Sequence, residues 1–255
     1  MPDDMTGLIP LTATTDTAPD LGRCALLIDF DGTLVDLAET PDGIDTTGVA
    51  ALLAHLKRAL DGRVVVVTGR PVEDLLRHLP GCPVPVYGSH GAELWREGEM
   101  VFTASSPPVM AEMRQAAQDF GADTSDVLFE DKPLGFALHF RQAPEQEEPV
   151  RSFLDDLTDD ADEVAVQSAK MAYEVKAGDV DKGTAVRDAV TRFGWQGHAP
   201  VMIGDDVTDE TGMAAAKALG GFGIKVGEGE TVAEWRVASP AALRRVFEDR
   251  FGAIT

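Results

Sequence analysis

Short, solidly apolar runs alternate with longer amphipathic stretches in the first part of the chain. The apolar runs lie at 26–28, 64–67 and 84–87, and their texture is that of strands buried on both faces. The intervening residues 46–60 and 71–79 carry leucine and valine at helical spacing. The order strand, helix, strand, helix, strand predicts a parallel sheet with right-handed crossovers.

The middle of the chain has a different pattern. Its predicted strands alternate apolar and polar residues, which is typical of an antiparallel sheet with one open face; they lie at 127–132, 135–141, 164–167 and 172–175. Two amphipathic helical stretches, 108–120 and 145–157, are expected to cover the other face. We therefore expect residues 92–176 to form an inserted α+β domain.

The first pattern returns in the last part of the chain. Helices are predicted at 182–193, 210–219 and 240–251, and buried strands at 200–203 and 222–226. The predicted fold class is thus α/β, with a Rossmann-like parallel-sheet core formed by residues 21–91 and 177–255. Residues 1–20 are acidic and rich in threonine, and we expect them to be a flexible leader.

Composition excludes several classes of partner. The chain has 22 Lys and Arg against 44 Asp and Glu, so its formal charge of −22 argues against binding nucleic acid or an anionic membrane. Two cysteines cannot build a disulfide framework, and no apolar run approaches the length of a membrane helix or signal peptide. A cytoplasmic protein is expected. In so acidic a chain, the few Lys and Arg residues in motifs carry extra information about an anionic substrate.

Chemistry-bearing residues begin where the first apolar run ends. Asp29 and Asp31 follow it, with Gly32 and Thr33 directly after them. An Asp-x-Asp-Gly run is often only a turn, and that alternative stays open for this motif by itself. Two carboxylates so close repel each other unless a cation lies between them, and Mg²⁺ prefers such oxygen ligands.

Three further loops strengthen the case for a site. Thr68 ends the second apolar strand, Asp205 and Asp209 follow the strand at 200–203, and Lys182 opens a helix. The carboxyl ends of parallel strands are where open α/β sheets bind ligands. A lysine at a helix N-terminus interacts unfavourably with the helix dipole, so another interaction must compensate for this at Lys182.

Together these motifs resemble the haloacid-dehalogenase (HAD) superfamily, and more narrowly its trehalose-6-phosphate phosphatases. The superfamily motifs are Asp29-Phe30-Asp31-Gly32-Thr33, Thr68, Lys182 and Gly204-Asp205-Asp206-x-x-Asp209; the narrower likeness rests on residues 87–93, Glu130-x-Lys132, His139-x-Arg141 and Glu174-x-Lys176. Thr68 stands where many relatives carry serine, which keeps the hydroxyl. The resemblance covers the chain from about residue 26 and implies a HAD core with a C2-type cap inserted between Thr68 and Lys182.

The resemblance also implies roles for individual residues. Asp29 would attack phosphorus and form an aspartyl-phosphate, and Asp31 would act as general acid and then base. Mg²⁺ would be held by Asp29, the main chain of Asp31, Asp205 and Asp209, while Thr68 and Lys182 would hold phosphoryl oxygens. Substrate-binding residues by resemblance are Gly69, Arg70, His90, Glu130, Lys132, Arg141, Lys170 and Glu174.

The expected function is Mg²⁺-dependent hydrolysis of trehalose 6-phosphate to trehalose and phosphate, with functional coupling to a trehalose-phosphate synthase. Two alternatives stay open. One keeps the mechanism and changes the sugar, to sucrose-phosphate or mannosyl-3-phosphoglycerate. The other is a non-catalytic regulatory partner of a trehalose synthase, against which the intact pair Asp29 and Asp31 argues.

Overall fold

The structure is a computed structural model, and it describes residues 9–10, 19–38, 43–104, 107–132, 134–161, 163–169, 171–178 and 180–253. Most of the predicted leader, and Lys170 among the predicted substrate-binding residues, lie outside these ranges. The chain divides into two compact units, Met1–Thr103 with Asp181–Thr255 and Ala104–Val180. Each is described by itself.

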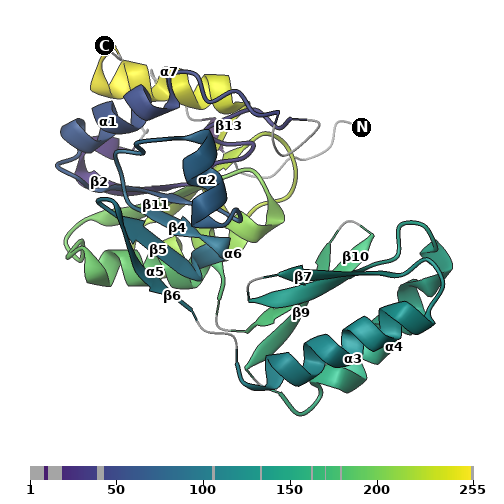
Figure 1. The fold of residues 1–255 in the computed structure, drawn as a ribbon. Coiled ribbons are helices and arrows are strands. Elements are labelled where there is room, and N and C mark those ends of the chain that lie inside the picture. Colours follow the sequence, from purple (N-terminus) through teal and green to yellow (C-terminus); the bar gives the residue numbers. More distant parts are fainter. Residues whose placement is uncertain are drawn as a thin grey trace, which may run out of the picture. The chain divides into compact units, whose positions relative to one another are not determined.

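The larger unit is built on a nine-stranded sheet in the order β1-β13-β12-β11-β2-β3-β4-β5-β6 (Figure 1). The strands from β1 to β4 in this order pair in parallel, and β5 and β6 add an antiparallel hairpin at one edge. Their bounds are β1 Ile9–Pro10, β2 Cys24–Ile28, β3 Val64–Val67, β4 Val86–Gly88, β5 Glu93–Arg96, β6 Glu99–Thr103, β11 Ala199–Gly204, β12 Phe222–Val226 and β13 Trp235–Val237.

Helices cover both faces of this sheet, which explains why its central strands are apolar throughout. Helices α1 (Val49–Ala59), α2 (Val72–His78) and α7 (Pro240–Phe251) pack on the face that carries Leu26 and Ile28. Helices α5 (Lys182–Arg192) and α6 (Val207–Ala218) pack on the face that carries Leu27 (Figure 1). Two short 3₁₀ turns, η1 (Leu21–Arg23) and η2 (Ser89–Gly91), complete the unit. The α/β class predicted from the sequence is confirmed.

The sequence pattern differs from the structure at the first domain boundary. Residues 93–103, which the pattern places in the inserted domain, form β5 and β6 of the large sheet. Val86 pairs with Trp95 and Tyr87 with Leu94, so the hairpin extends β4. The second boundary also shifts, from residue 176 to 180. The short strands β1 and β13 have no counterpart in the predicted elements.

The smaller unit has a four-stranded antiparallel sheet in the order β7-β8-β10-β9, as the alternating pattern predicts. Its strands are β7 Leu128–Lys132, β8 Gly135–His139, β9 Val164–Ala169 and β10 Ala172–Ala177. Helices α3 (Val109–Asp123) and α4 (Glu147–Thr158), with the turn η3 (Pro144–Gln146), lie on one side of the sheet (Figure 1). The apolar core between them contains Phe136, Leu138 and Val175. Alternate residues of the strands therefore form an open face.

Among the described residues, no helix combines the length and the apolar composition that crossing a membrane requires.

Candidate active site

Three neighbouring strands bring the predicted residues of the larger unit together at the carboxyl ends of the parallel strands. In the sheet, β2 lies between β11 and β3, and Ile28 pairs with both Ile203 and Val66. Asp29 directly follows β2, Thr68 follows β3 and Asp205 follows β11. The amide of Asp29 donates to the carbonyl of Ile203 at 2.9 Å, which fixes the first aspartate beside the β11 loop.

Lys182 lies at the centre of the acidic groups. Its Nζ donates to Asp29 Oδ1 and to Asp209 Oδ1, each at 2.6 Å, and its side chain is buried. Lys182 is the first residue of α5, which Asp181 caps by accepting from the amide of Thr184 at 2.7 Å. Burial by itself would lower the pKa of Lys182, but the carboxylates of Asp29 and Asp209 outweigh it and raise that pKa. The ammonium is thus held charged, and its partners offset the unfavourable helix dipole.

Three carboxylates converge beside this lysine. One oxygen from each of Asp29, Asp205 and Asp209 lies within 4.8 Å of the others. Burial raises the pKa of Asp29 well above its ordinary value, and burial followed by the charge of Asp209 raises that of Asp205. A hard divalent cation would relieve this crowding of negative charge, because carboxylate oxygens are its preferred ligands. The donor set therefore fits a Mg²⁺ ion.

Two glycines permit these carboxylates to approach. A Cβ on Gly32, whose φ is +76°, would lie 2.2 Å from Asp205 Oδ2, and one on Gly204 would lie 2.1 Å from Asp209 Cγ. Thr33 Oγ1 donates to Asp205 Oδ1 at 3.1 Å. The Asp-x-Asp-Gly run is therefore more than a turn, because Gly32 and Thr33 pack against Asp205 in the acidic loop that follows the distant strand β11.

Asp31 is held apart from the other carboxylates by an arginine. Arg70 Nε donates to Asp31 Oδ2 and Arg70 Nη2 to Asp31 Oδ1, both at 2.7 Å. The same guanidinium reaches Asp74 on α2 at 2.9 Å through Nη1. A planar guanidinium bound through two nitrogens fixes the orientation of a carboxylate. The family resemblance implies a substrate contact for Arg70, whereas these contacts direct it to Asp31.

The Thr68 loop packs tightly against the end of β4. Thr68 is fully buried, and its hydroxyl accepts from the amide of Arg70 at 3.1 Å. The amide of His90 donates to the carbonyl of Thr68 at 2.9 Å, and a Cβ on Gly69 would lie 2.8 Å from the imidazole of His90. Glu93 is an addition to the predicted set: it accepts from the amide of Val72 at 2.7 Å and so fastens the start of α2.

The predicted sugar-binding residues of the smaller unit gather on its sheet. Lys132 Nζ donates to Glu174 Oε2 at 2.7 Å, and the ring of His139 lies 2.6 Å from Glu130 Oε2. A pocket of about 440 Å³ is lined by Asp126, Leu128, Phe129, Glu130, His139, Arg141 and Gln142. Glu130 and Arg141 therefore share one pocket, while Lys132 and Glu174 form a separate pair.

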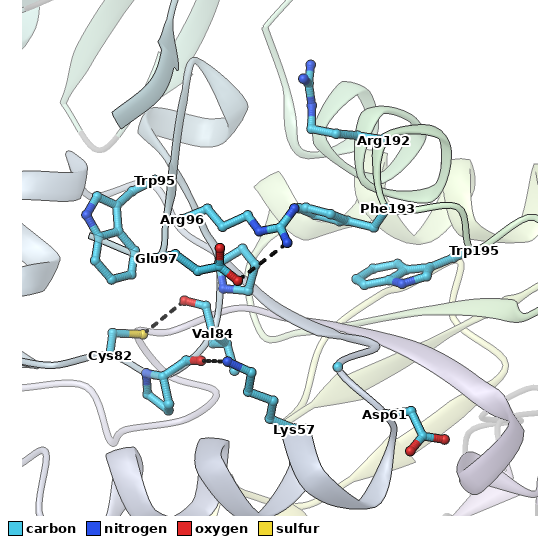
Figure 2. A pocket seen from close by; sticks show the side chains of 13 residues that line it. Lys57, Asp61, Cys82, Val84, Trp95, Arg96, Glu97, Arg192, Phe193 and Trp195 are labelled. Carbon is cyan, nitrogen blue, oxygen red and sulfur yellow. Dashed lines mark hydrogen bonds and ion pairs between the residues drawn. The ribbon is translucent and has the colours of Figure 1, made fainter. Parts of the chain in front are cut away.

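A second pocket, of about 490 Å³, contains none of the predicted residues (Figure 2). It lies near the residues that precede β3 and β4, at the amino ends of these strands, whereas Asp29 follows the carboxyl end of β2. Each of its three cations has a partner. Lys57 Nζ donates to the carbonyl of Pro83 at 2.7 Å, Arg96 lies 5.5 Å from the centre of the Phe193 ring, and Arg192 donates to Asp188 at 2.8 and 2.9 Å. Figure 2 shows these three side chains around the pocket. We assign it no part in the chemistry.

Fold and site together define a class of protein. A solved structure of a haloacid dehalogenase-like hydrolase from Bacteroides thetaiotaomicron shares this fold, with a TM-score of 0.67 at 14% identity over 88% of this chain and 98% of that one. The chain has the HAD fold with an inserted α+β unit, and it places clustered aspartates at the carboxyl ends of the parallel strands.

Sequence comparison then narrows the class. The model of the trehalose-phosphatase family matches residues 27–246, and the chain belongs to that family. It is 31% identical to the trehalose-6-phosphate phosphatase of Escherichia coli (strain K12) over 90% of this chain and 86% of that protein. A solved trehalose-6-phosphate phosphatase of Aspergillus fumigatus has the same fold, with a TM-score of 0.74 at 24% identity over 96% and 99% of the two chains. The predicted family is confirmed.

Proposed function

We propose that this protein hydrolyses trehalose 6-phosphate to trehalose and inorganic phosphate, with Mg²⁺ and through an aspartyl-phosphate on Asp29. The observation that carries the proposal is the position of Lys182, which bridges Asp29 and Asp209 at 2.6 Å each beside Asp205. A buried ammonium between carboxylates at the carboxyl ends of parallel strands suits an incoming phosphoryl group.

The first step is an in-line displacement at phosphorus. An oxygen of Asp29 forms a bond to phosphorus as the bond from phosphorus to the sugar oxygen breaks, and Asp31 donates a proton to that leaving oxygen. Water then attacks the phosphorus of the aspartyl-phosphate, Asp31 accepts a proton from it, and phosphate leaves with Asp29 restored. Asp31 therefore returns to its starting state after each turnover.

The remaining groups bind and orient. Asp29, Asp205, Asp209 and the main-chain carbonyl of Asp31 would hold Mg²⁺, which neutralises charge on the transferring group when bound. Lys182 and the hydroxyl of Thr68 would bind phosphoryl oxygens. Arg70 holds Asp31 in one orientation through its two hydrogen bonds.

Sugar recognition is proposed for the open face of the smaller sheet. Gly69 and His90, in the larger unit, stay sequence-based predictions of substrate contact. Glu130, Lys132, Arg141 and Glu174 offer carboxylates and cations, which suit the hydroxyls of a disaccharide. Lys170 belongs to this set as a sequence-based prediction. The pairs Lys132–Glu174 and His139–Glu130 show that these side chains already lie within reach of polar partners.

A substrate panel tests the proposal. Phosphate release is measured with trehalose 6-phosphate, sucrose 6-phosphate, mannosyl-3-phosphoglycerate and glucose 6-phosphate, each with Mg²⁺ and with EDTA. We expect the largest kcat/KM for trehalose 6-phosphate by more than about tenfold, which is a difference of about 1.4 kcal/mol in transition-state binding. A smaller preference would favour another sugar phosphate, and no release from any substrate would favour the non-catalytic alternative.

Two broader statements belong to the same proposal. A cytoplasmic location is consistent with Cys24 and Cys82, which are both buried free thiols. Functional coupling to a trehalose-phosphate synthase is suggested by a relative from Thermoproteus tenax named as a bifunctional synthase/phosphatase, of which the matching part is 32%. Co-purification with a synthase from the same source would test that coupling.

A further inference from the structure

A buried lysine outside the known motifs stands out in the larger unit. Six polar or charged residues are buried among those that the structure describes: Asp29, Thr33, Thr68, Lys182, Asp209 and Lys225. The first five belong to the candidate active site described above, in its strand-end loops or in the first turns of α5 and α6. Lys225 lies inside β12, is 4% exposed and has no role in the chemistry described above. Burying an ammonium group carries a large desolvation penalty unless hydrogen bonds and opposite charges compensate for it.

The main contact of Lys225 is with the metal-binding loop. Lys225 pairs in register with Gly204 on the neighbouring strand β11. Its Nζ donates to the main-chain carbonyl of Asp205, the next residue, at 2.7 Å. The carboxylate of Asp205 in turn accepts from Thr33 at 3.1 Å. Asp205 is thus held twice, by Lys225 through its main chain and by Thr33 through its side chain.

A second contact connects the same lysine to the start of α6. Lys225 Nζ lies 3.5 Å from Glu210 Oε1, a residue directly after Asp209. The other oxygen of Glu210 accepts from the amide of Val232 at 2.8 Å and from the hydroxyl of Thr231 at 3.1 Å. Lys225 therefore joins the loop of Asp205, the first turn of the helix that carries Asp209, and the segment before β13.

We propose that Lys225 is a positioning residue for the Asp205–Asp209 half of the metal site. It acts by fixing the main chain of Asp205, so that the carboxylate meets those of Asp29 and Asp209. The inference rests on the proposed function, since it requires that these three carboxylates bind Mg²⁺. Residues that orient metal ligands from the second layer typically change metal affinity by about 10- to 100-fold when they are removed.

Charge and positioning predict opposite results, which makes the proposal testable. Removing one positive charge beside the acidic cluster strengthens the attraction for a divalent cation. Removing the hydrogen bond to Asp205 loosens a ligand and weakens binding. Lys225→Met removes both charge and donor, whereas Lys225→Gln removes the charge and keeps an N–H donor. If positioning dominates, the Met variant binds the metal weakly and the Gln variant recovers part of the affinity.

The experiment measures Mn²⁺ binding without substrate, from the electron paramagnetic resonance signal of the free ion. Mn²⁺ is used because it accepts the same oxygen ligands as Mg²⁺. Wild type, Lys225→Met, Lys225→Gln and Lys225→Arg are compared with Lys217→Met, which removes a charge from α6 and from an exposed pair with Glu234. Thermal unfolding identifies folded variants, and the Gln and Arg variants keep the test available if the Met variant does not fold.

We expect the Kd for Mn²⁺ to rise about tenfold or more in Lys225→Met, less in Lys225→Gln, and little in Lys217→Met. Equal or tighter binding by folded Lys225→Met or Lys225→Gln would overturn the proposal and leave Lys225 as a charge only. A wild-type protein that neither binds Mn²⁺ nor releases phosphate would instead remove the proposed function. A wild type that does both, beside a variant with unchanged affinity, would remove this inference alone.

Discussion

Replacing Arg70 should slow the step that protonates the leaving sugar while sparing reactions that need no such proton. Arg70 binds both oxygens of Asp31 at 2.7 Å, and its side chain is 12% exposed. Without the guanidinium, the carboxyl group of Asp31 can rotate away from the leaving oxygen. General acid catalysis contributes about 10²- to 10⁴-fold, and losing the orientation of the acid should forfeit part of that.

The expected size follows from the two hydrogen bonds. Hydrogen bonds to charged groups contribute about 1.5–3 kcal/mol each, and the 30% exposure of Asp31 argues for the lower end, or about 3 kcal/mol for the two together. Loss of the orientation of Asp31 should forfeit part of this total. We expect kcat/KM for trehalose 6-phosphate to fall about 10- to 100-fold in Arg70→Met, which corresponds to about 1.4–2.8 kcal/mol of transition-state stabilisation.

The assay compares two leaving groups. The alkoxide of a sugar leaves poorly without a proton, whereas p-nitrophenolate leaves readily, so kcat/KM for p-nitrophenyl phosphate should change by less than about threefold in the same variant. Using kcat/KM restricts the comparison to the steps up to departure of the leaving group. Arg77→Met is the matched control, since it removes an exposed arginine from Asp74 at 2.7 Å.

Equal losses with both substrates would refute the orienting role and indicate that Arg70 acts on the fold or on phosphate binding. No loss with either substrate would show that the ion pair with Asp31 has no part in the reaction.

Other variants probe the same site. Lys182→Met leaves Asp29 and Asp209 without their shared cation and should lower the free energy of unfolding of the metal-free protein by about 3–5 kcal/mol in urea; a loss below about 1 kcal/mol would contradict the buried pairing. Gly204→Ala places a methyl 2.1 Å from Asp209 Cγ and should cost about 1–3 kcal/mol of stability and weaken Mg²⁺ binding, so unchanged Mg²⁺ dependence would count against this packing. Burial and the charge of Asp209 raise the pKa of Asp205, so between the unfolded pKa of about 3.8 and the raised pKa the folded protein binds more protons than the unfolded chain, and stability falls as pH rises through that range. In EDTA, Asp205→Asn should therefore unfold at a higher temperature than wild type at pH 7, with a difference that shrinks toward pH 4; lower stability at pH 7 would oppose this sign.

Much of the large sheet can be predicted from the sequence because its central strands are buried on both faces. Residues 64–67 form a run of four valines, and β3 has these same bounds. Each such run ends at once in polar residues, and the parallel register then brings Asp29, Thr68 and Asp205 together. Fold class and the main acidic cluster follow from this one pattern.

The edge of the sheet is harder to predict, because pairing there depends on distant partners. Residues 99–103 of β6 are largely exposed, with Met100 and Val101 nearly half accessible, so their pattern shows no buried face. The hairpin belongs to the large sheet because Tyr87 and Leu94 pair, a contact that no local periodicity encodes.

The contacts that support the site can be identified only once the fold is known. Arg70 follows Thr68 and Gly69 in the chain, yet its partner Asp31 lies on another strand-end loop. A sequence signal for Lys225 does exist, since it is a charged residue inside the apolar run at 222–226. Its partner, the carbonyl of Asp205, becomes evident only from the parallel pairing of β11 and β12.

The most direct test of the proposed mechanism is to identify the residue that receives the phosphoryl group. Protein turning over trehalose 6-phosphate with Mg²⁺ is quenched and treated with borohydride, which reduces an acyl phosphate to an alcohol, and its peptides are then read by mass spectrometry. A nucleophilic Asp29 predicts homoserine in place of aspartate at position 29, dependent on substrate and absent in Asp29→Asn, which should also release no phosphate. Modification at Asp31 or elsewhere, or phosphate release by a folded Asp29→Asn variant, would contradict it.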